Sequence, residues 1–231
     1  RASQKTIVIT GGSSGIGFET AKLLLENPET RIVLIGKEQE KLDEAERSLE
    51  APGRVMSITC DLRDSAAVKK TADRIIASQK HLYGLVNNAG IIKRELATTM
   101  SVADFRQVID VDLVGPFIMS QLVVKQMIER QEGKIINICS MMSELGRNSV
   151  SAYDAAKGGL KMLTRNLATE WAKHNIQVNG IGPGYFATSQ TEPIRVDGHP
   201  FNEFIINRTP AARWGNPEDL AGTAVFLASK A

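Results

Sequence analysis

Three side chains between residues 140 and 157 have types and spacing suited to moving a proton: Ser140, Tyr153 and Lys157. Tyr153 and Lys157 are four residues apart, so on a helix they lie on one face, one turn apart. An ammonium beside a phenol favours the phenolate, which makes the phenol a candidate acid and base near neutral pH. Ser140 ends the apolar run 134–139, which predicts a strand, and open α/β sheets bind ligands at the carboxyl ends of their strands. Alone, the Tyr-x-x-x-Lys pair is more often a solvated helix face, so other stretches must decide.

Size and composition indicate an ordinary globular protein with a single α/β domain over residues 1–231. A formal net charge of +2 gives no basic field for nucleic acid, and no apolar run approaches the roughly 20 residues of a membrane span. The N-terminus has no signal-peptide core. Cys60 and Cys139 each end an apolar run, so we expect buried, reduced thiols and a cytoplasmic location, with no nucleic-acid or membrane partner.

Apolar runs that alternate with helical patterns predict the fold class. Strands are expected at 6–10, 31–35, 55–59, 85–86, 134–138 and 176–181, and helices at 15–27, 38–50, 65–79, 101–129, 150–173 and 217–228. Strict alternation of strand and helix predicts a doubly wound parallel sheet with helices on both faces. Helix-start signals at Ser101 with Asp104, and at Asn216 with Pro217, support these boundaries.

A glycine-rich turn at residues 10–17 directly follows the first expected strand and opens the first expected helix. Glycines allow a tight turn and let backbone amides approach a pyrophosphate, whose charge the helix N-terminus favours. The turn therefore predicts a Rossmann-type dinucleotide site, with an ordinary connecting turn as the alternative. Its expected cofactor-binding residues are Gly11, Ser13, Ser14, Gly15, Ile16 and Gly17.

Later loops extend this cofactor site. The second expected strand ends in Gly36 and Lys37, where many NAD sites place a carboxylate for the adenosine ribose. A cation there suits a 2′-phosphate, so NADP(H) is the preferred cofactor and NAD(H) the alternative, unless Lys37 is a solvated loop lysine. Asp61, after the third strand, is expected either to accept from the adenine amino group or to cap a helix. The remaining expected cofactor contacts are Leu62, Asn88, Ala89, Gly90, Tyr153, Lys157, Pro183, Gly184 and Thr188.

Taken together, these motifs resemble the short-chain dehydrogenase/reductase family. The shared features are the turn at 10–17, the Asn-Asn-Ala-Gly run at 87–90, Ser140 thirteen residues before Tyr153, the Tyr-x-x-x-Lys pair, and the Pro-Gly pair at 183–184 with Thr188. The resemblance implies hydride transfer between NAD(P) and an alcohol or ketone. It also implies that Tyr153 donates a proton to the carbonyl oxygen, that Ser140 hydrogen-bonds the same oxygen, and that Lys157 favours the phenolate and holds the nicotinamide ribose.

Two features depart from the family pattern. The family usually has an asparagine in an Asn-Leu-x-Gly run, where it is thought to hold a water in a proton relay. The corresponding run here begins with Asp112, which can accept from water and favours Lys157 as a cation, so Asp112 remains a candidate relay residue. The chain also stops at Ala231, before the seventh strand of most family members, so the last family strand is expected to be absent.

A finer resemblance concerns the substrate. The runs 88–94, 137–147, 174–180 and 208–215 resemble the gluconate 5-dehydrogenase group, also called 5-keto-gluconate reductases, with 2-deoxy-gluconate 3-dehydrogenases as neighbours. Arg94 and Arg147 follow expected strands and are candidates for binding a carboxylate, and Glu144 is a candidate for sugar hydroxyls, with surface ion pairs as the alternative. Ser140 and Tyr153 complete the expected substrate site. The segment 185–209 is a candidate lid.

The leading hypothesis is an NADP-preferring enzyme that interconverts 5-keto-D-gluconate and D-gluconate. The alternatives are an oxidoreductase for another sugar acid, a polyol or a 3-oxoacyl thioester, and an inactive cofactor-binding sensor or scaffold. The resemblance implies a homodimer or homotetramer built on the helices at 101–129 and 150–173. His199 has no partner at metal-ligand spacing, so no metal is expected.

Overall fold

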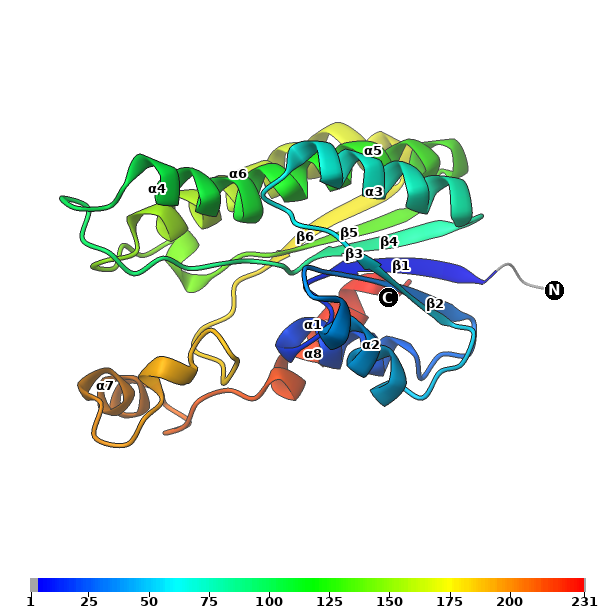
Figure 1. The fold of residues 1–231 in the computed structure, drawn as a ribbon. Helices are drawn as coiled ribbons and strands as arrows, with labels where there is room; N and C mark the ends of the chain where they lie inside the picture. Colours follow the sequence, from blue (N-terminus) through cyan, green and yellow to red (C-terminus); the bar gives the residue numbers. More distant parts are fainter. Residues whose placement is uncertain (1–3, 231) are drawn as a thin grey trace.

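The structure is a computed structural model that describes residues 4–230. Six parallel strands form one sheet in the order β3-β2-β1-β4-β5-β6 (Figure 1). The strands are β1 (Lys5–Thr10), β2 (Thr30–Gly36), β3 (Val55–Thr59), β4 (Leu82–Asn87), β5 (Gly133–Ile138) and β6 (Ile176–Ile181). The strand order reverses between β1 and β4, and in open α/β sheets such a reversal opens a crevice at the carboxyl ends of the strands.

Helices cover both faces of this sheet (Figure 1). One face carries α1 (Gly15–Leu24), α2 (Gln39–Ser48) and α8 (Pro217–Ala228), and the other carries α3 (Ser65–Ser78), α4 (Val102–Ile109), α5 (Gly115–Arg130) and α6 (Ser151–Trp171). α7 (Pro200–Arg208) stands apart from both layers. The arrangement confirms the doubly wound parallel sheet predicted from the sequence.

Each central strand buries side chains on both faces, which is why the strands read as nearly continuous apolar runs. Along β1, Val8 belongs to the core under α3, α5 and α6, whereas Ile7 and Ile9 belong to the core under α1, α2 and α8. Cys60 and Cys139 are free and buried, as expected for small apolar side chains, and Cys60 belongs to the core under α3, α5 and α6.

β4 is longer than the sequence predicted, since it covers Leu82–Asn87 rather than 85–86. Gly84 in its middle weakened the strand signal, because glycine is unfavourable inside a strand. The glycine has a packing reason here: a Cβ at this position would lie 3.1 Å from Cγ1 of Ile7 on β1. The close approach of β1 and β4 therefore explains why a glycine stands at position 84 inside the strand.

The helix expected at 101–129 is interrupted. α4 ends at Ile109, a π-helical turn covers Asp110–Val114, and α5 begins at Gly115. Ser101 caps α4 by accepting a hydrogen bond from the Asp104 N–H at 3.0 Å, as its spacing predicted. π turns inside helices are rare and frequently occur at functional sites. This one buries the carboxylate of Asp112.

The whole helical run Val102–Arg130 is long and apolar enough, by length and composition, to cross a membrane. However, 56% of its most apolar stretch is buried within the protein. Met119, Val123 and Met127 pack in the core between α3 and the sheet. Core helices pass the same length and composition test, and the burial identifies this run as one of them.

Candidate active site

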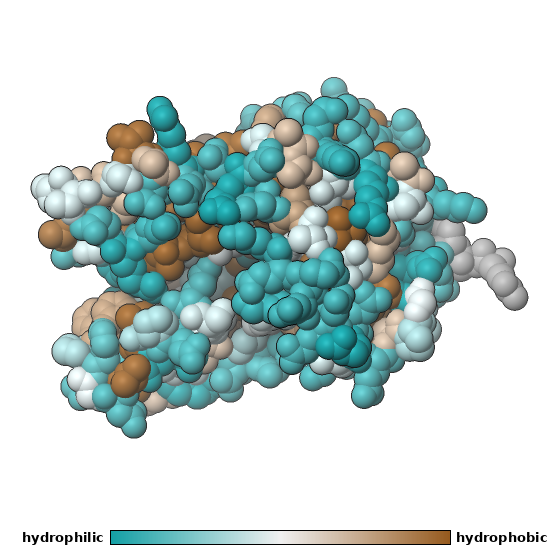
Figure 2. Space-filling view, viewed as in Figure 1, coloured by the Kyte–Doolittle hydropathy of each residue, from teal (hydrophilic) through white to brown (hydrophobic). Residues whose placement is uncertain are grey.

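The carboxyl ends of the strands open into a cavity of about 850 Å³. Loops that follow each of the six strands contribute to its lining, and Figure 2 shows this face of the molecule hollowed between the α4 side and the α7 side. The volume lies within the range of about 300–1,000 Å³ that is typical of small-molecule and cofactor pockets. The cavity therefore lies where the strand reversal predicts a ligand.

Most residues predicted from the sequence line this cavity. They are Gly11, Ser13, Ser14, Gly15, Ile16, Lys37, Asp61, Leu62, Asn88, Ala89, Gly90, Arg94, Ser140, Tyr153, Lys157, Pro183, Gly184 and Thr188. Gly17, Asp112, Glu144 and Arg147 do not line it. The first two are buried, whereas Glu144 is exposed and Arg147 is half-buried.

The glycine turn has the geometry of an anion cradle. Gly11 and Gly15 have φ angles of +64° and +55°, which disfavour other residues. A Cβ at Gly11 would lie 2.9 Å from Cα of Ala89, and one at Gly17 would lie 2.5 Å from the Gly11 carbonyl oxygen. The side chain of Ser14, the N-cap of α1, makes no capping hydrogen bond. The first-turn N–H groups of α1 therefore keep the free donors that a pyrophosphate requires.

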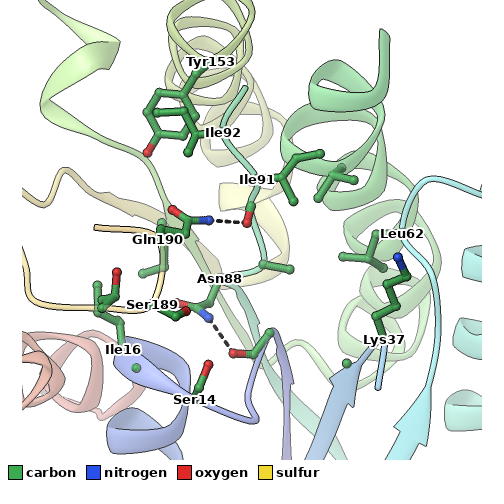
Figure 3. Close-up of a pocket in the computed structure, with 18 of the residues that line it drawn as sticks. Ser14, Ile16, Lys37, Leu62, Asn88, Ile91, Ile92, Tyr153, Ser189 and Gln190 are labelled. Carbon is green, nitrogen blue, oxygen red and sulfur yellow. Dashed lines mark hydrogen bonds between the residues drawn. The ribbon is translucent and has the colours of Figure 1, made fainter. Parts of the chain in front are cut away.

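Asn88 fixes this turn against the loop after β4 (Figure 3). Its Nδ2 donates to the carbonyl oxygens of Thr10 at 3.1 Å and Gly11 at 3.0 Å. In return, Thr10 Oγ1 accepts from the N–H groups of Asn88 and Ala89, both at 3.1 Å. The amide thus joins two cavity walls that are far apart in the sequence.

Lys37 lies beside Leu62 at one end of the cavity (Figure 3) and makes no ion pair with any residue of the range 4–230. Two other cations in the lining are already paired. Lys41 Nζ lies 2.8 Å from Glu38 Oε1, and Arg63 pairs with Asp61. Lys37 is therefore the cation at this end that makes no ion pair with a described carboxylate, although its charge contributes to the lowered pKa of Asp61.

Asp61 forms an ion pair with Arg63 and does not cap a helix. Hydrogen bonds from the Arg63 guanidinium lower the pKa of this carboxyl to about 2. α3 is capped instead by Asp64, which accepts from the N–H groups of Ala66 and Ala67. The helix-capping alternative for Asp61 is therefore wrong.

Ser140, Tyr153 and Lys157 meet at the other end of the cavity. Lys157 Nζ lies 5.6 Å from the centroid of the Tyr153 ring and donates to the Ile138 carbonyl oxygen at 2.8 Å. The Tyr153 hydroxyl points into the cavity (Figure 3). Ser143 ties the group together, because its Oγ accepts from the Ser140 N–H at 3.2 Å and donates to the Lys157 carbonyl oxygen at 2.8 Å.

Asp112 lies directly behind this group. Its Oδ2 is 3.4 Å from Lys157 Nζ, and the two side chains are 0% and 4% exposed. Its Oδ1 accepts from the Ile91 N–H at 2.8 Å. Burial raises the pKa of the Asp112 carboxyl, and the Lys157 charge opposes that rise. Burial, the largest single effect, would lower the pKa of Lys157, but Asp112 together with Tyr153 and Cys139 outweighs it, so the pKa of this ammonium lies above its usual value.

Arg94 and Arg147 form a like-charge pair near Tyr153. Burial lowers the pKa of the Arg94 guanidinium, the positive charge of Arg147 lowers it further, and Tyr153 acts in the opposite direction. Arg94 Nη2 donates to the Gln190 carbonyl oxygen at 3.1 Å, and the Arg147 guanidinium lies 5.0 Å from the centroid of the Phe201 ring. Within residues 4–230 neither arginine makes an ion pair with a carboxylate.

Glu144 lies apart from the expected substrate site. It follows a 3-10 turn at Met141–Ser143, its side chain is 56% exposed, and it forms an ion pair with Lys161. The surface ion pair that the sequence left open as an alternative is the arrangement that the structure shows for this residue.

The segment 185–209 contacts the rest of the site through Gln190 and through Phe201, which stacks with Arg147. Gln190 Nε2 donates to the Gly90 carbonyl oxygen, which bridges the loops after β6 and β4 (Figure 3). His199 caps α7, because its Nδ1 accepts from the Phe201 N–H at 3.1 Å. Trp214 Nε1 donates to Asn202 Oδ1 at 2.7 Å. His199 and Trp214 therefore both have structural partners within the described residues.

Three residues with evident roles in this geometry were not singled out from the sequence: Arg63, Ser143 and Gln190. Arg63 is two residues from Asp61, so a carboxylate-to-arginine spacing was visible but had no motif to mark it. Ser143 lies three residues after Ser140, the spacing of a capping box, which is a usable signal. Gln190 lies in an irregular segment, and nothing local indicates that it reaches Gly90.

The fold and the converging site define a class of dehydrogenases, and comparison with known proteins agrees. The family described as short chain dehydrogenase matches residues 5–198, and the chain belongs to the short-chain dehydrogenase/reductase family. It is therefore an NAD(P)-dependent oxidoreductase that acts on CH–OH groups.

Similar proteins come from several bacteria. The chain is 58% identical over 228 residues to 2-dehydro-3-deoxy-D-gluconate 5-dehydrogenase of Formosa agariphila, an alignment that covers 98% of this chain and 86% of the relative. It is 41% identical to 5-keto-D-gluconate 5-reductase of Escherichia coli, covering 98% and 89%. A crystal structure of a gluconate 5-dehydrogenase from Burkholderia cenocepacia in complex with NADP and tartrate superimposes with a TM-score of 0.89 at 37% identity, covering 99% and 89%.

Proposed function

We propose that this protein interconverts a hydroxyl and a ketone at carbon 5 of a gluconate-type sugar acid, with NADP(H) as the preferred cofactor. The observation that carries the proposal is the pair of arginines, Arg94 and Arg147, without carboxylate partners beside Tyr153. Guanidinium groups bind carboxylates bidentately. The relatives named above act at carbon 5 of such acids, which supports the same carbon here.

The cradle fits a dinucleotide. Gly11, Ser13, Ser14, Gly15 and Ile16 would hold the pyrophosphate at the start of α1, where a Cβ would fill the space at Gly11. Lys37, Asp61 and Leu62 would surround the adenosine, and Pro183, Gly184 and Thr188 would lie at the nicotinamide end. Asn88, Ala89 and Gly90 would line the path between these two ends. When bound, the nicotinamide supplies or accepts the hydride.

The chain's own groups supply the proton chemistry. In the reduction direction Tyr153 gives its hydroxyl proton to the ketone oxygen, and in oxidation its phenolate takes the proton back. Ser140 donates a hydrogen bond to the same oxygen and holds it in place. Lys157 keeps its charge beside the phenol, since it is held by the Ile138 carbonyl and by Asp112. Arg94 and Arg147 bind the carboxylate, which fixes the carbon that faces Tyr153.

Assays with two sugar acids test the proposal and identify the preferred substrate. The 58% identity to the Formosa relative favours 2-dehydro-3-deoxy-D-gluconate, and the resemblance of residues 137–147 favours 5-keto-D-gluconate. Oxidation of the first with NADP⁺ and reduction of the second with NADPH are followed by the absorbance of NADPH. Turnover of either supports the proposal, and the ratio of kcat/KM values selects the substrate. Binding of NADPH without turnover of any sugar acid would instead favour an inactive cofactor-binding protein.

The arginine pair predicts a selective loss of sugar-acid activity. Arg94→Leu and Arg147→Leu are each expected to lower kcat/KM for the sugar acid about 10- to 100-fold, mainly through KM, because a charged hydrogen bond contributes about 1.5–3 kcal/mol. Activity on an uncharged ketose should change little. Arg208→Leu is the matched control, since that guanidinium also stacks on a phenylalanine of α7, 5.2 Å from the Phe204 ring centroid, but unlike Arg147 is not among the charges that act on Arg94. Equal losses on charged and uncharged substrates would contradict the carboxylate role.

The place of Lys37 in the cavity lining, without an ion pair to a described carboxylate, predicts the cofactor preference. Lys37→Ala is expected to raise KM for NADPH about tenfold or more and to leave KM for NADH nearly unchanged, because only NADPH carries the 2′-phosphate. Lys41→Ala removes a neighbouring cation that is already paired with Glu38 and should have a smaller effect. Steady-state kinetics with both cofactors measure the difference. A wild-type preference for NADH would show that the Lys37 argument is wrong.

We further propose that the segment 185–209 is the lid of a single domain. The bridge from Gln190 to Gly90 lies across the cavity between the loops after β6 and β4, so the dinucleotide would pass beneath it. α7 and its aromatic contacts give this segment a folded outer part that can move as a unit.

A further inference from the structure

Asp112 places a charge where the family pattern has an uncharged asparagine. The carboxylate is completely buried, yet its Oδ2 has no aligned hydrogen-bond donor, although Lys157 Nζ is 3.4 Å away. Its Oδ1 accepts from the Ile91 N–H. An asparagine side chain has an oxygen that can accept this bond equally well. The hydrogen bond therefore does not explain the charge, and the contact with Lys157 remains as its reason.

The groups around Lys157 leave Asp112 as its counter-charge. From α6 the neighbour is the phenol of Tyr153, and from the end of β5 it is Cys139, whose thiol pKa is raised by burial so that it stays neutral. From the loop after β4 the charge of Arg94 interacts with Tyr153, and Arg94 also interacts with Arg147. All of these charges except Asp112 are positive, and each positive charge near a phenol favours the phenolate.

We propose that Asp112 is a positioning residue that balances the charge of Lys157 and so sets the pH range in which Tyr153 exchanges its proton. Without this carboxylate burial lowers the pKa of Lys157, but over the pH range in which Lys157 keeps its proton the ammonium acts on the phenol uncompensated, and the phenolate forms at lower pH. With it, the phenol keeps its proton to higher pH, which suits the reduction direction. The inference rests on the proposed acid and base role of Tyr153.

The test is the pH dependence of Asp112→Asn. Rates are measured from about pH 5 to about pH 10, the range that spans carboxyl and phenol titration, in oxidation and in reduction. In the pH–rate profiles, the acidic limb for oxidation and the alkaline limb for reduction are both expected to move to lower pH by about one unit, the size expected for the loss of one nearby charge. Asp112→Ser should shift both limbs in the same direction. Asp110→Asn removes a carboxylate from the same π turn that makes no ion pair with a described residue, and it should shift neither.

A second measurement does not depend on turnover. Ultraviolet difference titration of each protein against its Tyr153→Phe counterpart reports the phenolate of Tyr153 directly and should show the same shift. Folded Asp112 variants with unshifted titrations would overturn the proposal. Loss of folding in both variants would also overturn it, because the carboxylate would then serve the fold. If Tyr153→Phe keeps full activity, the proposed function fails instead, and the phenolate titration still decides the role of Asp112.

Discussion

Tyr153→Phe is expected to lower kcat by about 10²- to 10⁴-fold in both directions, the usual contribution of a positioned acid or base. The hydroxyl that points into the cavity is the group removed, and the ring remains to fill the same space (Figure 3). Affinity for NADPH, measured by fluorescence, should change little, because the glycine turn and Lys37 are untouched. The loss should therefore appear in kcat and not in cofactor binding.

Tyr185→Phe is the matched control for this prediction. Its phenol does not line the cavity, and its ring packs against Phe201 and Trp214 at centroid distances of 5.9 and 5.8 Å. Activity close to wild type is expected for this variant. Comparable losses in the two phenylalanine variants would mean that the hydroxyl of Tyr153 has no special part in proton transfer.

Lys157→Met is expected to abolish measurable activity and to lower the free energy of unfolding by about 3–5 kcal/mol at neutral pH. The stability loss follows because the variant leaves the Asp112 carboxylate buried without its counter-charge. Urea or thermal unfolding measures it. The double variant Lys157→Met with Asp112→Asn removes both charges and should regain much of the stability but none of the activity. A double variant as unstable as the single one would argue against the ion pair as the cause.

The stability loss of Lys157→Met should depend on pH in a definite direction. Burial raises the pKa of Asp112, and the substitution removes the ammonium that opposes this rise. A carboxyl whose pKa is higher in the folded than in the unfolded state binds its proton more tightly when folded. The deficit is therefore smallest below the ordinary carboxyl pKa of about 4 and grows as the pH rises through the raised value. A deficit that is independent of pH would contradict this account.

The order of strands and helices could be predicted from the sequence alone because it depends on local patterns. Residues 6–10 and 31–35 form apolar runs of strand length, and the glycine turn at 10–17 joins a strand to a helix. The structure confirms these elements with boundaries close to those expected. The four-residue spacing of Tyr153 and Lys157 likewise places both side chains on one face of α6, whatever the rest of the chain does.

Only the tertiary structure decided which charged groups are paired. Lys37 and Lys41 look alike in the sequence, yet Lys41 pairs with Glu38 and Lys37 pairs with no described carboxylate. Glu144 and Arg147 lie three residues apart, but one faces Lys161 on the surface and the other stacks on Phe201 of α7. Charge pairing is a matter of a few ångströms, and loops place side chains at that scale only after the sheet has assembled.

Around Tyr153, some contacts could be predicted from the sequence and others required the tertiary structure. Ser140, Tyr153 and Lys157 were predictable because one strand end and one helix carry them. The burial of Asp112 against Lys157 requires a π turn in a different helix, and the bridge from Gln190 to Gly90 joins residues that are 100 positions apart. Local sequence determines elements and the faces of helices, whereas contacts between distant loops follow from how the sheet and its helices pack. The charge environment of the proposed acid belongs to this second kind.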